Sequence, residues 1–230
     1  MSTFLSGGIS ISIAEHFPKG AGPFPAVIVV HGSGGPRTAV EQYTPMLTRA
    51  GYAVFVVNYF ERTETAWATP QLIDKHFPVW LEVLADAVTY VESRPEVDPG
   101  RIGLLGVSLG SFLSLSLATY DHRVATVVDL FGGIPEFFLE KARAMPPVLI
   151  LHGEDDAVVP VREVYKLEAL LKRLGATYEC KTYPGQGHAL GGMAAWDAAQ
   201  RIYKFLEANL KRGDRREQQT ESDISDARLQ

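Results

Sequence analysis

The chain has 230 residues, of which 46% are hydrophobic and 21% charged, and its formal net charge is −5. This is the profile of a globular protein, and the mild negative charge excludes the basic surface that nucleic-acid binding requires. The single cysteine excludes an internal disulfide framework and indicates a reducing compartment. No apolar run is long enough to span a bilayer and no secretory signal is recognisable, so we expect a cytoplasmic protein without a membrane partner.

From residue 26 onward, short β-branched runs alternate with amphipathic stretches, a pattern that predicts alternating strands and helices. Strands are expected at residues 9–16, 26–30, 52–58, 102–105, 124–131, 147–151 and 177–183. Helices are expected at residues 39–50, 72–93, 135–145, 162–174 and 194–210, with Pro78 kinking or breaking the second helix near its start. The alternation predicts one domain, residues 1–211, with a mostly parallel central sheet and helices on both faces. Residues 212–230 are charged and lack aromatic residues, so we expect a disordered tail there.

The central motif is Gly106-Val-Ser-Leu-Gly110, which has the Gly-x-Ser-x-Gly pattern of a nucleophile elbow between a strand and a helix. A serine on so sharp a turn is strained, and side chains two positions before and after it would collide, so both positions require glycine. Residues 112–117 alternate apolar residues with serine, which alone indicates a strand. We nevertheless expect a helix there, because the elbow serine must open one and small serine side chains let a helix pack closely on a sheet.

The polar residues of the chain gather after the predicted strands, at the carboxyl edge where an open α/β sheet binds ligands. A nucleophilic serine needs a histidine base and a carboxylate that fixes the tautomer of that histidine. Ser108, Asp156 and His188 occur in the order nucleophile, acid and histidine, which is the order of the α/β-hydrolase fold. Asp155 and Asp129 remain rival candidates for the acid.

Two other histidines, His31 and His152, each end a predicted strand and precede a glycine. We expect both to be structural and to bond nearby loop backbone rather than to act as the base.

An oxyanion hole needs backbone N–H donors beside the nucleophile. Leu109, directly after the nucleophile, is expected to supply one donor. The glycine-rich loop after residues 26–30 is expected to supply the other, with Ser33 as the preferred donor and Gly34 as its rival.

Four segments together resemble the α/β-hydrolase superfamily: His31-Gly-Ser-Gly-Gly, the elbow, His152-Gly-Glu-Asp-Asp and Gly187-His188. The size of the chain, its loop sequences and the lack of a large lid domain resemble the dienelactone hydrolase branch. The resemblance covers roughly residues 10–210 and implies the α/β-hydrolase fold. It also implies a serine esterase that cleaves esters or lactones of small molecules through an acyl-enzyme, without a metal or cofactor. In that reaction Ser108 is the nucleophile, His188 the base and Asp156 the orienting acid.

The chain departs from dienelactone hydrolases proper in three ways. Those enzymes use a cysteine nucleophile where this chain has Ser108, and an acidic residue in the oxyanion loop where it has Gly32. They hold the substrate carboxylate with arginines. Arg62 matches one of them in position, but no arginine follows His188 in residues 189–192. We therefore expect a general carboxylic ester hydrolase, with Arg62 as a candidate substrate-binding residue.

Two alternatives remain at this point: a serine peptidase or acyl-aminoacyl hydrolase of the same fold, and a binding protein that has lost catalysis. A peptidase usually needs a further domain to hold its peptide, and 230 residues leave little room for one. We expect the substrate pocket to be lined by residues 59–70, residues 132–138 and the residues after His188. The protein is expected to act as a monomer or homodimer on a small-molecule ester.

Overall fold

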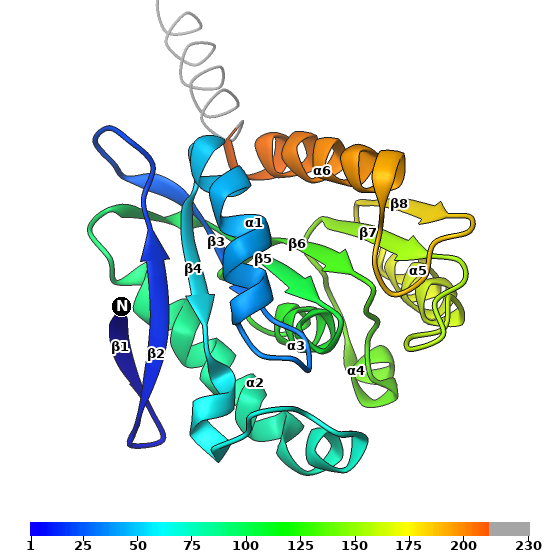
Figure 1. The fold of residues 1–230 in the computed structure, drawn as a ribbon, viewed down its shortest axis with the longest axis horizontal. Helices are drawn as coiled ribbons and strands as arrows, with labels where there is room; N and C mark the ends of the chain where they lie inside the picture. The colour runs from blue at the N-terminus through cyan, green and yellow to red at the C-terminus, as the bar shows by residue number, and fades with distance from the viewer. Residues whose placement is uncertain (212–230) are drawn as a thin grey trace, which may run out of the picture.

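The computed structural model of the chain describes residues 1–211, so the tail expected at residues 212–230 lies outside the described residues. Eight strands form one sheet in the order β1-β2-β4-β3-β5-β6-β7-β8 (Figure 1). Their bounds are β1 (Ser2–Ser6), β2 (Ile9–His16), β3 (Phe24–Val30), β4 (Ala53–Val57), β5 (Val97–Val107), β6 (Val124–Leu130), β7 (Val148–Gly153) and β8 (Tyr178–Tyr183). Strand β2 runs antiparallel to both of its neighbours, and all pairings from β4 to β8 are parallel. The mostly parallel sheet predicted from the sequence is confirmed.

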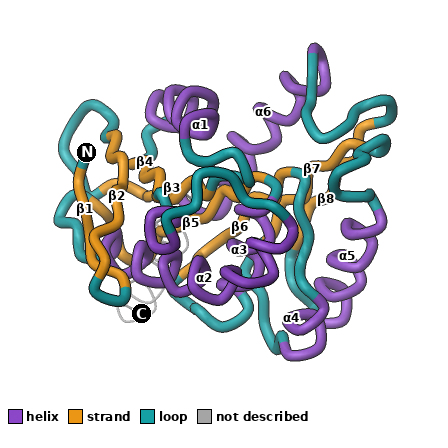
Figure 2. Tube along the Cα trace, turned by 60° about the horizontal axis from the view of Figure 1, so that its bottom comes forward, coloured by secondary structure: helices purple, strands orange, loops and turns teal. Residues whose placement is uncertain are grey.

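Helices cover both faces of the sheet, as the alternating sequence pattern predicts (Figure 2). They are α1 (Arg37–Arg49), α2 (Pro70–Glu92), α3 (Leu109–Ala118), α4 (Glu136–Lys141), α5 (Arg162–Leu174) and α6 (Gly192–Leu206), with short turns η1 (Tyr59–Thr63) and η2 (Glu207–Lys211). Helices α1 and α6 lie on one face, and α2, α3, α4 and α5 lie on the other. Residues of α1 and α6 line a cavity on their face of the sheet.

Strand β3 shows why the central strands read as unbroken apolar runs. Ala26, Ile28 and Val30 point into the core that the sheet shares with α2, α3 and α5. Val27 and Val29 point into the core that it shares with α1 and α6. Because a strand covered on both faces has no solvent side, every one of these positions is apolar.

The structure differs from the sequence-based prediction at β1 and at α2. Strand β1 was not predicted, because it is a short edge strand whose exposed positions include Leu5, so it lacks a clear apolar face. Helix α2 continues through Pro78, so this proline does not break the helix. Trp80, Leu84 and Val88 are fully buried along α2, and their packing outweighs the hydrogen bond lost at the proline.

Candidate active site

Ser108 lies on the turn between β5 and α3, in the strained conformation that the elbow pattern predicts. Its φ is 53° and its ψ is −119°, a region that residues with a side chain rarely adopt. A Cβ on Gly106 would collide with the first turn of α3, and a Cβ on Gly110 would collide with the carbonyl oxygen of Val30. Close packing therefore requires both glycines. The Ser108 amide donates a hydrogen bond of 2.8 Å to the Leu130 carbonyl, which ties the turn to β6.

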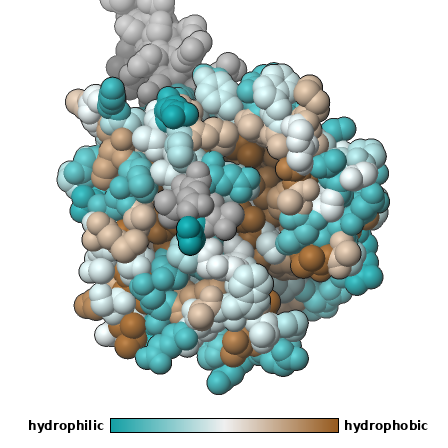
Figure 3. Space-filling model, viewed as in Figure 1, coloured by the Kyte–Doolittle hydropathy of each residue, from teal (hydrophilic) through white to brown (hydrophobic). Residues whose placement is uncertain are grey.

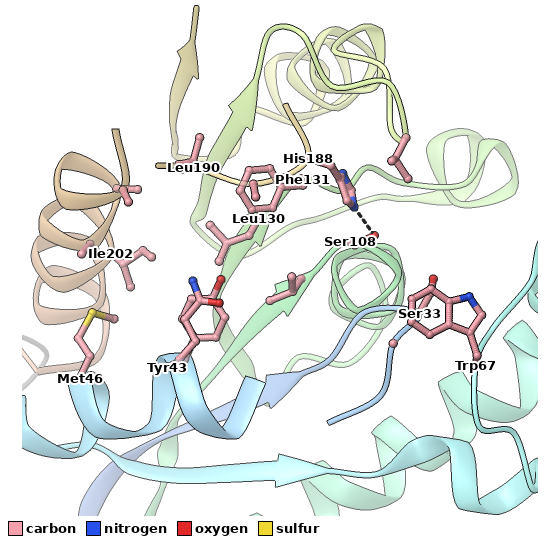
Figure 4. A pocket seen from close by; sticks show the side chains of 18 residues that line it. Ser33, Tyr43, Met46, Trp67, Ser108, Leu130, Phe131, His188, Leu190 and Ile202 are labelled. Carbon is pink, nitrogen blue, oxygen red and sulfur yellow. Dashed lines mark hydrogen bonds between the residues drawn. The ribbon is translucent and has the colours of Figure 1, made fainter. Parts of the chain in front are cut away.

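The structure brings Ser108, His188 and Asp156 together in series. Ser108 Oγ lies 2.9 Å from His188 Nε2 (Figure 4). On the other side of the ring, His188 Nδ1 lies 2.6 Å from Asp156 Oδ2. An ionised carboxylate can only accept a hydrogen bond, so Nδ1 carries the ring proton and Nε2 is left to accept the proton of the Ser108 hydroxyl. A nucleophile and its base require this arrangement.

Asp156 is the one of the three candidate carboxylates that reaches the base. Asp155 is exposed to solvent, and its amide donates to the Gln186 carbonyl at 2.9 Å. Asp129 is completely buried on β6, where its Oδ1 accepts a hydrogen bond of 2.9 Å from the Gly132 amide. The geometry therefore favours Asp156 over both rivals.

The loop after β7 holds the Asp156 carboxylate from several sides. Asp156 Oδ1 accepts hydrogen bonds from the amides of Val158 and Val159 at 2.8 and 2.9 Å. His152, which is fully buried, places its Nε2 2.8 Å from the Val159 carbonyl and 3.4 Å from Asp156 Oδ2. Burial raises the pKa of the neighbouring Asp129 to about 6. The hydrogen bonds of Asp129 and its attraction to His152 act in the opposite direction and lower this pKa. The acid of the series thus belongs to a buried polar cluster.

His31 is also structural, and it fixes the loop after β3. Its ring stacks on Tyr59 with centroids 4.1 Å apart, and its Nδ1 lies 2.8 Å from the Gly32 carbonyl. The Tyr59 hydroxyl donates to the His31 carbonyl at 2.8 Å. Burial lowers the pKa of His31 to about 4, so the imidazole is neutral at neutral pH. The expectation that His31 and His152 bond loop backbone is confirmed.

The glycine-rich loop passes directly beside the nucleophile. A Cβ on Gly32 would lie 3.3 Å from the Cβ of Ser108, and both Ser33 and Gly34 line the same cavity as Ser108. The amide of Leu109 is the first N–H of α3, and the first N–H groups of a helix have no carbonyl partner within it. The glycine-rich loop and the start of α3 thus both lie beside Ser108.

A cavity of about 550 Å³ opens over Ser108 and His188. Trp67, Ala189 and Leu190 line it, which agrees with the expected contributions of residues 59–70 and of the residues after His188. The expectation for residues 132–138 is wrong, since the cavity is lined instead by Phe131, by α1 and by α6. The contribution of α6 had a signal in the sequence: alanines recur on one side of that helix and leave space beside it.

Arg62 does not reach this cavity. It lies in η1, and its guanidinium packs against Gly7 in the turn between β1 and β2, where an added Cβ would overlap it. Arg62 is absent from the described residues that line the cavity. A substrate-binding role for Arg62 finds no support in this placement.

Within residues 1–211, apart from the side chains of residues 38–41, which the structure does not describe, no group of three or more His, Cys, Asp or Glu side chains is arranged to hold a metal ion. In the same part of the chain, no helix is both long enough and apolar enough to cross a bilayer.

A mostly parallel sheet, a serine on a strand–turn–helix elbow, and a histidine and a carboxylate from loops after later strands define an α/β hydrolase. The chain belongs to the dienelactone hydrolase family, whose family model matches residues 13–202. The family and fold predicted from the sequence are confirmed.

Known proteins resemble the chain at two levels. Acyl-coenzyme A thioesterase 5 of Mus musculus is 36% identical over 115 residues, which is 50% of this chain and 25% of that protein. The chain thus spans about a quarter of the length of this relative. The dienelactone hydrolase-like promiscuous phosphotriesterase P91 from metagenomic libraries has a TM-score of 0.79 at 16% identity and covers 90% of this chain and 96% of its own. Dienelactone hydrolase from Anabaena variabilis has a TM-score of 0.73 at 19% identity, covering 91% and 97%. These two structures share the fold.

Proposed function

We propose that this protein hydrolyses carboxylic esters of small molecules through a covalent acyl-enzyme. The observation that carries the proposal is the continuous series from the Ser108 hydroxyl through His188 to Asp156, with distances of 2.9 and 2.6 Å. Membership of the dienelactone hydrolase family supports an ester carbonyl as the reacting group. The relative named acyl-coenzyme A thioesterase 5 supports the same class of reaction, since its name describes the hydrolysis of an acyl thioester.

In the first half-reaction, Ser108 Oγ attacks the ester carbonyl carbon while His188 Nε2 takes the hydroxyl proton. The negative charge that develops on the carbonyl oxygen is stabilised by the backbone amides of Leu109 and Ser33, with Gly34 as the alternative donor. Collapse of this intermediate breaks the bond to the alcohol, which leaves with the proton that His188 returns to it.

In the second half-reaction, His188 Nε2 takes a proton from a water molecule that attacks the acyl-enzyme carbonyl. The bond from Ser108 to the acyl group breaks, the Ser108 oxygen recovers a proton from His188, and the carboxylic acid leaves. Throughout, Asp156 keeps the Nδ1 proton in place and stabilises the imidazolium that forms twice per turnover.

The base provides the most direct test. We expect His188→Ala to lower kcat for p-nitrophenyl acetate by roughly 10³–10⁴-fold, with an unchanged circular dichroism spectrum. His122→Ala is the matched control, since His122 is an exposed histidine outside the series, and its activity should equal that of the wild type. Undiminished turnover in His188→Ala would mean that another group is the base.

A fluorophosphonate probe separates an esterase from a catalytically silent binding protein. The probe should label wild-type protein on Ser108 and should not label Ser108→Ala, as mass spectrometry of the labelled peptide will show. No adduct in folded wild-type protein favours the binding protein. Faster cleavage of aminoacyl-anilides than of esters favours the peptidase instead.

A further inference from the structure

The cavity over Ser108 has two ends of different character. Ser33 and Trp67 lie at one end, Met46 and Ile202 lie at the other, and the Ser108–His188 pair lies between them (Figure 4). The first end is open to solvent, because the side chain of Trp67 is 65% exposed. The second end runs between α1 and α6, and we call this part the α1–α6 arm.

The α1–α6 arm is largely apolar, although the exposed Gln42 of α1 also lines the cavity. Tyr43, Leu130, Ala198 and Ile202 line it and are each less than 10% exposed. Figure 3 shows brown, apolar side chains in the hollow between the two helices. Burial raises the pKa of Tyr43 to about 12, so its phenol stays neutral.

No formally charged side chain is found among the described residues that line the cavity. An ionised carboxylate placed in the α1–α6 arm would therefore lose its hydration without gaining a cationic partner. A hydrocarbon chain placed there loses only its contact with water, and this transfer is favourable. The arm therefore discriminates against charged groups.

The order of events on Ser108 indicates which part of an ester occupies the arm. The alcohol must leave the site before water can attack, whereas the acyl group stays bonded to Ser108 until the end. The open end beside Trp67, which is 65% exposed, gives the alcohol a direct exit. The largely apolar arm suits the group that remains.

We propose that the acyl group of the substrate is an uncharged hydrocarbon chain of medium length that extends from Ser108 into the α1–α6 arm. This inference rests on the proposed esterase function and deepens it by naming the substrate class. It differs from the carboxylate-bearing lactones that the resemblance to dienelactone hydrolases suggests. It agrees with the absence of Arg62 from the described residues that line the cavity.

Three alanines of α6 set the width of the arm. Ala195, Ala198 and Ala199, followed by Ile202, recur at helical spacing and all line the cavity. A larger side chain at one of these positions would fill space that the acyl chain otherwise uses. We therefore assign these alanines as determinants of acyl-chain length.

The first experiment uses the wild-type protein and three p-nitrophenyl esters: the acetate, the octanoate and the half-ester of suberate. Octanoate and suberate have the same chain length, but suberate ends in a carboxylate. We expect kcat/KM for the octanoate to exceed that for the acetate by at least roughly tenfold, since each buried methylene contributes about fourfold. The suberate half-ester should be at least roughly a hundredfold poorer than the octanoate.

Substrate concentrations stay below the micellar range, so that the protein meets single molecules. Equal rates for octanoate and suberate overturn the proposal. So does a chain-length preference that appears in alkyl acetates of increasing alcohol length but not in the acyl series. If Ser108 takes no fluorophosphonate label and no ester is cleaved, the proposed function itself has failed. Cleavage of all esters without a preference removes only the present inference.

The second experiment narrows the arm. We expect Ala199→Leu to lower the octanoate-to-acetate ratio of kcat/KM by at least roughly tenfold, because the added side chain occupies the space of several methylenes. Ala169→Leu is the matched control, since Ala169 lies exposed on α5, and its ratio should match that of the wild type. If Ala199→Leu does not fold, Ala195→Leu provides the same ratio at a half-buried position near the start of α6. An unchanged ratio in a folded variant contradicts the proposal.

Discussion

Two segments of this protein carry the dipeptide His-Gly at the carboxyl end of a central strand, yet they have different roles. His31-Gly32 directly follows β3, and His152-Gly153 forms the last two residues of β7. Both histidines are buried, and both bond a carbonyl of the loop that follows. They differ in what surrounds the rest of the ring.

The His31 ring lies among aromatic rings: it stacks on Tyr59 and meets Phe60 in a T-shaped contact with ring centroids 4.7 Å apart. Its loop passes directly beside the nucleophile. The Nε2 atom of His152 lies 3.4 Å from Asp156 Oδ2, and the ring also interacts electrostatically with Asp129. Its loop presents a carboxylate to the base.

The comparison teaches that a buried histidine at a strand end takes its role from the charge of its neighbours. In apolar surroundings, as at His31, an imidazole stays neutral and serves as a rigid hydrogen-bonding group. Beside a carboxylate, the same group helps to hold the loop that carries the acid. The following predictions address this difference, from the largest expected effect to the smallest.

Removing the charge on the β7 side should have the largest effect. In Asp156→Asn, the amide can donate to His188, which favours the wrong tautomer and leaves Nε2 protonated. We expect kcat for p-nitrophenyl acetate to fall about 10⁴-fold, or about 5.5 kcal/mol in activation free energy, with little change in KM. Steady-state kinetics measures this, and a loss below tenfold would remove Asp156 from the acid role.

His31 should make folding stability depend on pH. Its pKa is about 4 in the folded protein against an ordinary 6.5, so between these values the unfolded chain binds the proton and the folded chain does not. Its contribution is complete above pH 6.5 and is lost as the pH falls to 4, by on the order of 3 kcal/mol. His31→Phe, which can keep the stack on Tyr59, should abolish this loss in urea titrations across that range.

The readout is the difference between wild type and His31→Phe at each pH. This matters because Asp129, whose pKa is raised, has the opposite sign: its contribution is present below pH 3.8 and is lost as the pH rises through 6. Identical slopes for the two proteins would show that His31 is charged in the folded state.

Removing the His152 side chain, which bonds the loop after β7, should have a moderate effect. His152→Leu leaves the partly buried Val159 carbonyl without the donor that now lies 2.8 Å away. We expect a loss of about 1–3 kcal/mol in the free energy of unfolding and a fall in kcat rather than a rise in KM, because the Asp156 loop is less well held. Urea denaturation and steady-state kinetics measure the two effects. A rise in KM with unchanged kcat would place His152 outside the support of the acid.

Asp129→Asn should have the smallest effect and the opposite sign. The amide oxygen can still accept from the Gly132 amide, and no charge then needs to be buried. We expect a gain of about 1 kcal/mol in unfolding free energy at pH 8 and no gain at pH 4, with kcat retained. Denaturation at the two pH values tests this. If the variant loses activity as Asp156→Asn does, Asp129 rather than Asp156 orients the base.

The sequence predicted the elements whose pattern is set by local physics. The elbow was recognisable because steric exclusion at Gly106 and Gly110 leaves a fixed spacing around Ser108. The helix after the elbow had to be inferred against its own alternating pattern, and Ser111, Ser114 and Ser116 are indeed completely buried against the sheet.

The choice among the carboxylates and the outline of the cavity could not be read in the same way. Asp155 and Asp156 are neighbours in sequence, and only the turn that points one inward and the other outward separates them. The cavity depends on how far apart α1 and α6 sit across β5, a tertiary distance that no local pattern encodes. Arg62 matched a family position but lies at the β1–β2 turn, because packing against Gly7 decides its direction.

The hydrogen bond from the Ser108 amide to the Leu130 carbonyl has a further consequence for how activity is lost on warming. The nucleophile is fastened to the central strands, so its amide hydrogen should exchange with deuterium only when the sheet itself opens. His188 lies instead on a connecting segment at the rim, where local opening costs less. Warming should therefore first displace the His188 imidazole while the Ser108 hydroxyl is still held in position. Activity should be lost at this stage and should return on cooling.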